Sequence, residues 1–186
     1  MIFWTKPFRS PWLWGAMLAM LAGCEPPALN PQRVIKEEGF EGVAPAGSPN
    51  GLYSQEQAHS WARSMKVGQE AEYGQLSAST WGELGRPHHI RLRLWAWLPI
   101  AASNRATVEV VVRRPGVAGE APASLGSHTF NLCEVVRRYQ QWVPSTYFVS
   151  LPRDLRPTDE VVVFIWVRPG IDTPIYVDDF SIENLD

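Results

Sequence analysis

One run in the middle of the chain alternates strictly between aliphatic side chains and side chains that are basic or aromatic. It reads "HIRLRLWAWL" at 89–98. A period of two places alternate residues on opposite faces of an extended strand. One predicted face carries Ile90, Leu92, Leu94, Ala96 and Leu98, and the other carries Arg91, Arg93, Trp95 and Trp97. The run therefore predicts a strand with one buried face, and a sheet that needs a second layer to cover it.

Four further segments predict more strands. Residues 106–114 and 147–152 repeat the alternation, and 174–182 closes the chain. Residues 160–167, "EVVVFIWV", are apolar on both faces, which is typical of a central strand in a covered sheet. Short strands separated by Pro- and Gly-rich turns favour an all-β fold, an antiparallel β-sandwich in a single domain.

Two segments leave their local structure less determined. Residues 54–66 predict either a short helix or a loop that leads into a strand. Residues 130–142 begin with strand-like alternation and continue with helical spacing, so we expect a strand end followed by a short helical turn.

The N-terminus has the layout of a secretory signal. Lys6 and Arg9 precede an apolar run at 11–22, and no acidic residue occurs there. A basic segment followed by 7–15 apolar residues is typical of a signal peptide. A transmembrane helix needs about 20 apolar residues, so this run is too short for a stable span.

The signal ends in Leu21-Ala22-Gly23-Cys24, which resembles the lipobox of bacterial lipoproteins. The resemblance implies cleavage before Cys24 and lipidation of its thiol; the alternative is a chance cysteine after an ordinary signal. Prolines 26 and 27 suit an extended tether. We therefore predict a signal peptide at 1–23, a lipidated cysteine and tether at 24–33, and a domain at 34–186, anchored in the bacterial cell envelope on its periplasmic or cell-surface side.

Charge and cysteine content narrow the partners and the chemistry. The formal net charge is −2, and removing the basic signal makes the mature chain more acidic, so a nucleic-acid partner is not expected. With Cys24 acylated, only Cys133 remains and no internal disulfide can form. We interpret Cys133 as a small buried apolar residue.

Three segments together resemble a known fold family. These are "EEGFEG" at 37–42, Trp142 with the extended run to Pro152, and "IYVDDFSIENL" at 175–185. In this order they resemble the jelly-roll carbohydrate-binding modules appended to xylanases and cellulases, and the wider galactose-binding-like β-sandwich. The resemblance covers about residues 34–186 and implies a jelly roll. It says less about function, because one fold hosts many functions.

The same resemblance implies a structural calcium ion that joins the first strand to the last. The matching positions are Glu41, Asp178 and Asp179. Ca²⁺ takes six to eight oxygen ligands, so carboxylates from both chain ends would suit it. The alternative is that Asp178 and Asp179 form a bulge or turn whose carboxylates cap backbone N–H groups.

The predicted outer face of 89–98 is the candidate ligand-binding surface. Sugar rings stack on aromatic faces while their hydroxyls bond to polar groups, and Arg91, Arg93, Trp95 and Trp97 supply both. Thr107, Glu109 and Arg113 would extend this face if the next strand paired beside it. Alternatively, the N-terminal segment or a loop at 115–128 covers the tryptophans, and the arginine stems simply pack on them. Trp142 and Trp166 are assigned to packing.

Catalytic motifs are weak in this chain. Glu70 and Glu72 share a predicted strand face and could be spaced like a hydrolase pair, but a solvated strand explains them as well. The adjacent His88 and His89 would point to opposite faces, which suits a single metal poorly. We therefore predict a non-catalytic, carbohydrate-binding envelope lipoprotein; the alternative is an adaptor that docks another envelope protein and has no glycan ligand.

Overall fold

The computed structural model describes residues 33–42, 52–68, 71–100, 106–117, 119–170 and 173–186. Its strands are β1 (Val34–Glu38), β2 (Tyr53–Ser54), β3 (Ser64–Val67), β4 (Tyr73–Thr80), β5 (His89–Trp97), β6 (Ala106–Arg114), β7 (Ala123–Asn131), β8 (Trp142–Ser150), β9 (Glu160–Val167) and β10 (Ile175–Asn184). One short helix, α1 (Leu132–Val135), follows β7.

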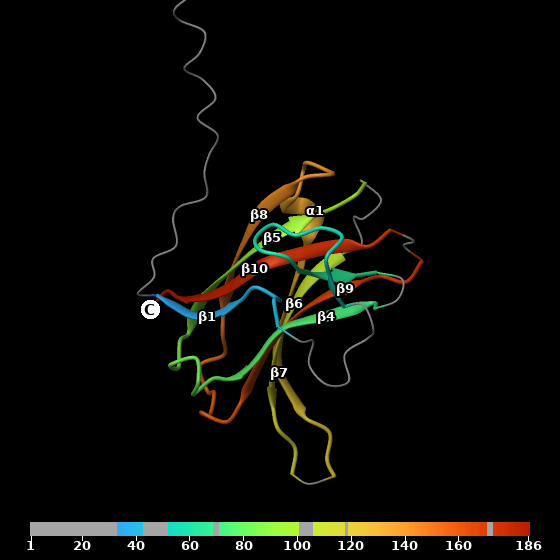
Figure 1. Ribbon diagram of the computed structural model, residues 1–186. Coiled ribbons are helices and arrows are strands. Elements are labelled where there is room, and N and C mark those ends of the chain that lie inside the picture. Colours follow the sequence, from blue (N-terminus) through green and yellow to red (C-terminus); the bar gives the residue numbers. More distant parts are fainter. Residues whose placement is uncertain (1–32, 43–51, 69–70, 101–105, 118, 171–172) are drawn as a thin grey trace, which may run out of the picture.

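The strands form two antiparallel sheets that pack face to face (Figure 1). The first has the order β2-β3-β10-β5-β8, and β1 also pairs with β10. The second has the order β4-β9-β6-β7. From β3 to β10 the chain crosses repeatedly between the sheets, which is the connectivity of a jelly roll. The prediction of an antiparallel jelly-roll β-sandwich is confirmed.

The core lies between the sheets and follows the alternation in the sequence. Ile90, Leu92, Leu94 and Ala96 of β5 are at most 1% exposed. Strands β6, β9 and β10 contribute many of the other core side chains, including Val108, Val110, Val112, Val163, Ile165, Val177, Phe180 and Ile182. As predicted for 160–167, β9 is an inner strand, between β4 and β6. The outer face of β5 is thereby left free for other interactions.

The two ambiguous segments are now assigned. Residues 55–63 form a loop that leads into β3, so the loop alternative holds there. After β7, Asn131 caps α1 because its side-chain oxygen accepts the N–H of Cys133 at 3.0 Å. The expected strand end followed by a helical turn is therefore confirmed.

Two expectations about neighbours of the 89–98 strand are wrong. β6 pairs with β7 and β9 in the second sheet, so Thr107, Glu109 and Arg113 do not extend the outer face of β5. Residues 123–128 of the expected loop at 115–128 belong to β7, also in the second sheet. Alternation predicts strands but not their partners, and here the chain changes sheets between consecutive strands.

Several predictions fall on residues outside the described part of the chain. They are the signal peptide, Cys24 and most of the tether, and also Glu70. Within the described residues, no helix is long and apolar enough to cross a membrane.

Candidate functional site

A cleft of about 540 Å³ lies on the outer face of the first sheet. Its walls come from β1 and the segment after it, the 55–63 loop, and β5, β8 and β10. Its side chains combine indole rings with charged and hydroxyl groups. The lining residues are Glu37, Glu38, Gly39, Phe40, Glu41, Gly42, Trp61, Arg93, Leu94, Trp95, Pro144, Ser145, Asp179, Phe180 and Ser181.

A β-bulge in β10 shapes the floor of this cleft. The pairing of β10 with β5 shifts register between Asp178 and Ser181, and Asp179 has a positive φ of 47°. On its other edge β10 pairs first with β3 and then with β1, and the bulge falls between the two pairings. Aspartate tolerates this left-handed conformation better than most residues. The bulge re-aims the Asp179 side chain toward the cleft.

The buried Asp178 carboxylate ties the 55–63 loop to the sheet. Its Oδ2 accepts the backbone N–H of His59 at 2.9 Å and that of Ser60 at 3.1 Å. Its Oδ1 accepts the N–H of Asp179 at 2.8 Å. Burial raises the pKa of Asp178, and these hydrogen bonds oppose that rise. The loop is thus held by a carboxylate whose charge is costly to bury.

Asp179 makes the second attachment of the loop. Its Oδ2 lies 2.6 Å from Nδ1 of His59, and its Oδ1 accepts the hydroxyl of Ser60. The imidazole of His59 stacks on Trp95, with ring centroids 3.8 Å apart, and presents its edge to Trp142 at 5.7 Å. One side of the Trp95 ring is therefore covered by His59 of the 55–63 loop.

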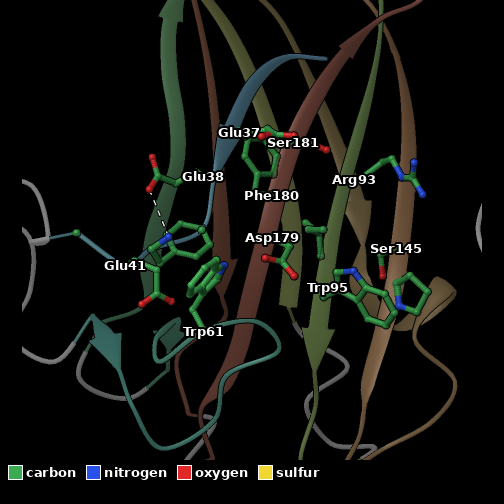
Figure 2. A pocket seen from close by; sticks show the side chains of 15 residues that line it. Glu37, Glu38, Glu41, Trp61, Arg93, Trp95, Ser145, Asp179, Phe180 and Ser181 are labelled. Carbon is green, nitrogen blue, oxygen red and sulfur yellow. Dashed lines mark hydrogen bonds between the residues drawn. The ribbon is translucent and has the colours of Figure 1, made fainter. Parts of the chain in front are cut away.

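Trp61 follows directly and is the most exposed large apolar residue among those described. It is 89% exposed and has a positive φ of 55°. The adjacent backbone is fixed because Oε1 of Glu41 accepts the N–H groups of Ala62 and Arg63, at 3.2 and 3.0 Å. Figure 2 shows Asp179 between Trp61 on one side and Trp95 with Arg93 on the other. The cleft therefore has an aromatic ring on each wall.

The four predicted ligand-binding residues share one face but divide into two groups. Arg93 and Trp95 line the cleft, whereas Arg91 and Trp97 are not among its lining residues. Both arginines pair with the fully buried Glu183 of β10, and Trp97 presents an edge-on contact to Tyr176 at 5.5 Å. Arg91 and Trp97 thus have packing partners of their own in the sheet.

The three predicted calcium ligands already accept hydrogen bonds from other groups of the chain. Asp178 and Asp179 form the bulge that was the alternative, and both oxygens of Asp178 accept backbone N–H groups. Glu41 likewise accepts N–H groups from Ala62 and Arg63. Among the described residues, no group of three or more His, Cys, Asp or Glu could hold a metal ion. Calcium stays a prediction, which unfolding with and without a chelator would test.

The cleft residues that the sequence analysis did not predict include Trp61, Glu37 and Ser181. Trp61 lies in a loop, where no periodicity gives it a direction. Glu37 of β1 and Ser181 of β10 are far apart in the sequence, and they become neighbours because the two strands pair. The hydroxyl of Ser181 is 3% exposed and has no hydrogen-bond partner in the part of the chain described. The segments "EEGFEG" and "VDDFSI" were noticed in the sequence, but they were interpreted as strand ends and not as walls of a cleft.

Comparison with solved structures identifies the same fold elsewhere. The tandem of family 22 carbohydrate-binding modules from Paenibacillus barcinonensis Xyn10C matches with a TM-score of 0.50 and 14% identity, over 82% of this chain and 50% of that one. The C-terminal family 22 module of Clostridium thermocellum Xyn10B matches with a TM-score of 0.47 and 15% identity, over 84% and 96%. No family model and no curated protein matches the sequence. The likeness therefore shows the fold, and function has to be argued from the cleft.

Proposed function

We propose that this domain is a non-catalytic glycan-binding module, and that Cys24 anchors it by lipid to the bacterial cell envelope. The observation that carries the proposal is the pairing of Trp61 and Trp95 on opposite walls of one cleft. The Asp179 carboxylate lies between them, and further carboxylates, the Arg93 guanidinium and hydroxyl groups also line the cleft. Aromatic faces with a few fixed polar groups are what a sugar-binding site requires.

Packing alone explains Trp61 poorly. A solvent exposure of 89% means that its ring stabilises the fold very little. The loop that carries it is nevertheless held by the Asp178 and Asp179 carboxylates, which include a costly buried charge. A fixed, exposed indole at the mouth of a cleft is suited to contact a ligand.

An adaptor that docks another protein would be expected to expose an apolar patch without a groove. The described residues instead form a groove with a polar floor, which favours a small polar ligand over a protein surface. Likeness in fold to carbohydrate-binding modules is consistent with this, although at 14% identity it carries no ligand across.

A hydrolase would need two carboxylates placed across a glycosidic bond, and the cleft does contain several acidic residues. Three of them already accept hydrogen bonds: Asp179 from Ser60, Glu41 from two backbone N–H groups, and Glu38 from the N–H of Phe40 at 3.4 Å. Mass spectrometry of a glycan after overnight incubation separates the two functions. Intact glycan supports binding alone, and shortened products would overturn the non-catalytic assignment.

A glycan array probed with the full chain in detergent tests the proposal. Binding that Trp61→Ala and Trp95→Ala each weaken would support it. Tyr73→Ala is the matched control, because Tyr73 is 58% exposed but lies on β4 in the other sheet. Silence across the array with folded protein would overturn glycan binding. Loss of membrane partitioning in Cys24→Ser is expected for the anchor.

A further inference from the structure

The charges around the cleft are unbalanced. Its acidic lining residues are Glu37, Glu38, Glu41 and Asp179, and Arg93 is the only basic lining residue in the described part of the chain. The guanidinium of Arg93 lies 3.4 Å from Oε1 of Glu183, which is fully buried. The Arg93 charge is therefore partly neutralised by Glu183. The open space of the cleft faces mainly carboxylates.

The carboxylates differ in how freely they can meet a ligand. Asp179 is held by His59 and Ser60, and Glu41 uses Oε1 for two backbone N–H groups. Glu37 is exposed, and no side-chain hydrogen bond involves it within the described residues. Two positive groups lie nearby on the loop: the guanidinium of Arg63 bonds to the carbonyl of Gly42 at 3.3 Å, and His59 carries a charge only when protonated.

The floor of the cleft also contains a hydroxyl without a hydrogen-bond partner in the described residues. Ser181 is 97% buried, its Oγ has no partner in the described structure, and it lies in register between Arg93 and Glu37. Buried hydroxyls are nearly always hydrogen-bonded in native proteins, so a ligand or water group is expected to meet this one. The same ligand would then lie beside the carboxylates.

We propose that this cleft selects glycans by charge, binding sugars that carry protonated amino groups and rejecting sugars that carry carboxylate or sulfate groups. The inference rests on the proposed glycan-binding function and names its substrate class. An ammonium group on the sugar would pair with Glu37, hydroxyls would bond to Ser181, and the exposed indole of Trp61 would add a cation–π contact. An anionic sugar would instead meet like charges.

Three oligosaccharides with the same β-1,4-linked backbone test this: a glucosamine hexamer, a glucose hexamer and a glucuronate hexamer. Each is titrated calorimetrically into the full chain in detergent. We expect the amine to bind about tenfold tighter than the neutral sugar, and the uronate to bind at least tenfold weaker, as about one net ion pair near a surface implies. Raising NaCl from about 20 to about 200 mM should weaken binding of the glucosamine hexamer more than binding of the glucose hexamer.

Glu37→Gln should reduce affinity for the amine more than for the neutral sugar. Asp154→Asn, an exposed carboxylate in the segment between β8 and β9, should change neither. Equal affinities for all three sugars, or tighter uronate binding, would overturn charge selection while leaving glycan binding intact. If none of these sugars, nor any array glycan, binds folded protein, the proposed function and the inference fall together.

Discussion

Removing the Asp178 carboxylate should release the 55–63 loop. The side chain is fully buried and accepts three backbone N–H groups, from His59, Ser60 and Asp179. We compare Asp178→Ala, which deletes every acceptor, with Asp178→Asn. The amide keeps one oxygen for His59 and Ser60 and turns an NH₂ group toward the N–H of Asp179.

The magnitude follows from these three bonds. A hydrogen bond to a charged group contributes about 1.5–3 kcal/mol, but the N–H groups of the exposed loop can bond to water instead. Relief of the buried charge offsets part of the loss, because burial already raises the pKa of Asp178. We expect Asp178→Ala to lower the free energy of unfolding by about 2–3 kcal/mol and Asp178→Asn by about 1 kcal/mol or less.

Urea unfolding followed by tryptophan fluorescence measures both losses, and hydrogen exchange at 59–63 reports the opening of the loop directly.

The raised pKa of Asp178 determines the sign of the pH dependence. The native state holds the Asp178 proton more tightly than the unfolded state, so wild type should gain stability relative to Asp178→Asn as pH falls from 7 toward 4. Equal losses for both variants, or a loss below about 0.5 kcal/mol for Asp178→Ala, would refute the anchoring role.

Three further outcomes are expected. Trp61→Ala should leave the free energy of unfolding within about 0.5 kcal/mol of wild type, because the ring is exposed, and should still weaken glycan binding in titration. The Arg114 guanidinium holds the pKa of Asp159 below its ordinary value. The stability that this pair contributes is therefore present at neutral pH and lost as pH falls through the carboxylate range. The urea midpoints at pH 6 and pH 3 should differ less in Asp159→Asn than in wild type. Gly74→Ala would place a methyl group against the buried Met65 and should cost about 1–3 kcal/mol, measured by thermal unfolding.

The layers of the fold could be predicted because burial follows alternation. In β5 the apolar residues enter the core and the arginines and tryptophans face outward, as the sequence indicates. Pairing could not be predicted in the same way. Thr107 of β6 has the right spacing to continue the face of β5, yet β6 lies in the opposite sheet. Alternation specifies which side of a strand is buried and leaves its neighbours open.

The cleft was only partly predictable for a related reason. Arg93 and Trp95 lie on a regular strand, so their direction follows from the pattern. Trp61 lies in a loop whose path depends on N–H groups capped by Asp178, 118 residues further along the chain from Ser60. The sequence suggested a structural role for the Asp178–Asp179 pair, with calcium or backbone capping as alternatives. The structure has the carboxylates capping the loop that carries Trp61.

The role of Trp61 and Trp95 in glycan binding is tested by ¹⁹F NMR of the full chain labelled with 5-fluorotryptophan, titrated with the strongest glycan from the array. Single Trp→Phe variants assign the resonances. We expect the signals of Trp61 and Trp95 to shift together with one affinity. The signal of Trp81, which is 9% exposed and donates its indole N–H to the carbonyl of Pro87, should stay unchanged. Binding that moves other tryptophans and leaves Trp61 and Trp95 unshifted would contradict the cleft as the glycan site.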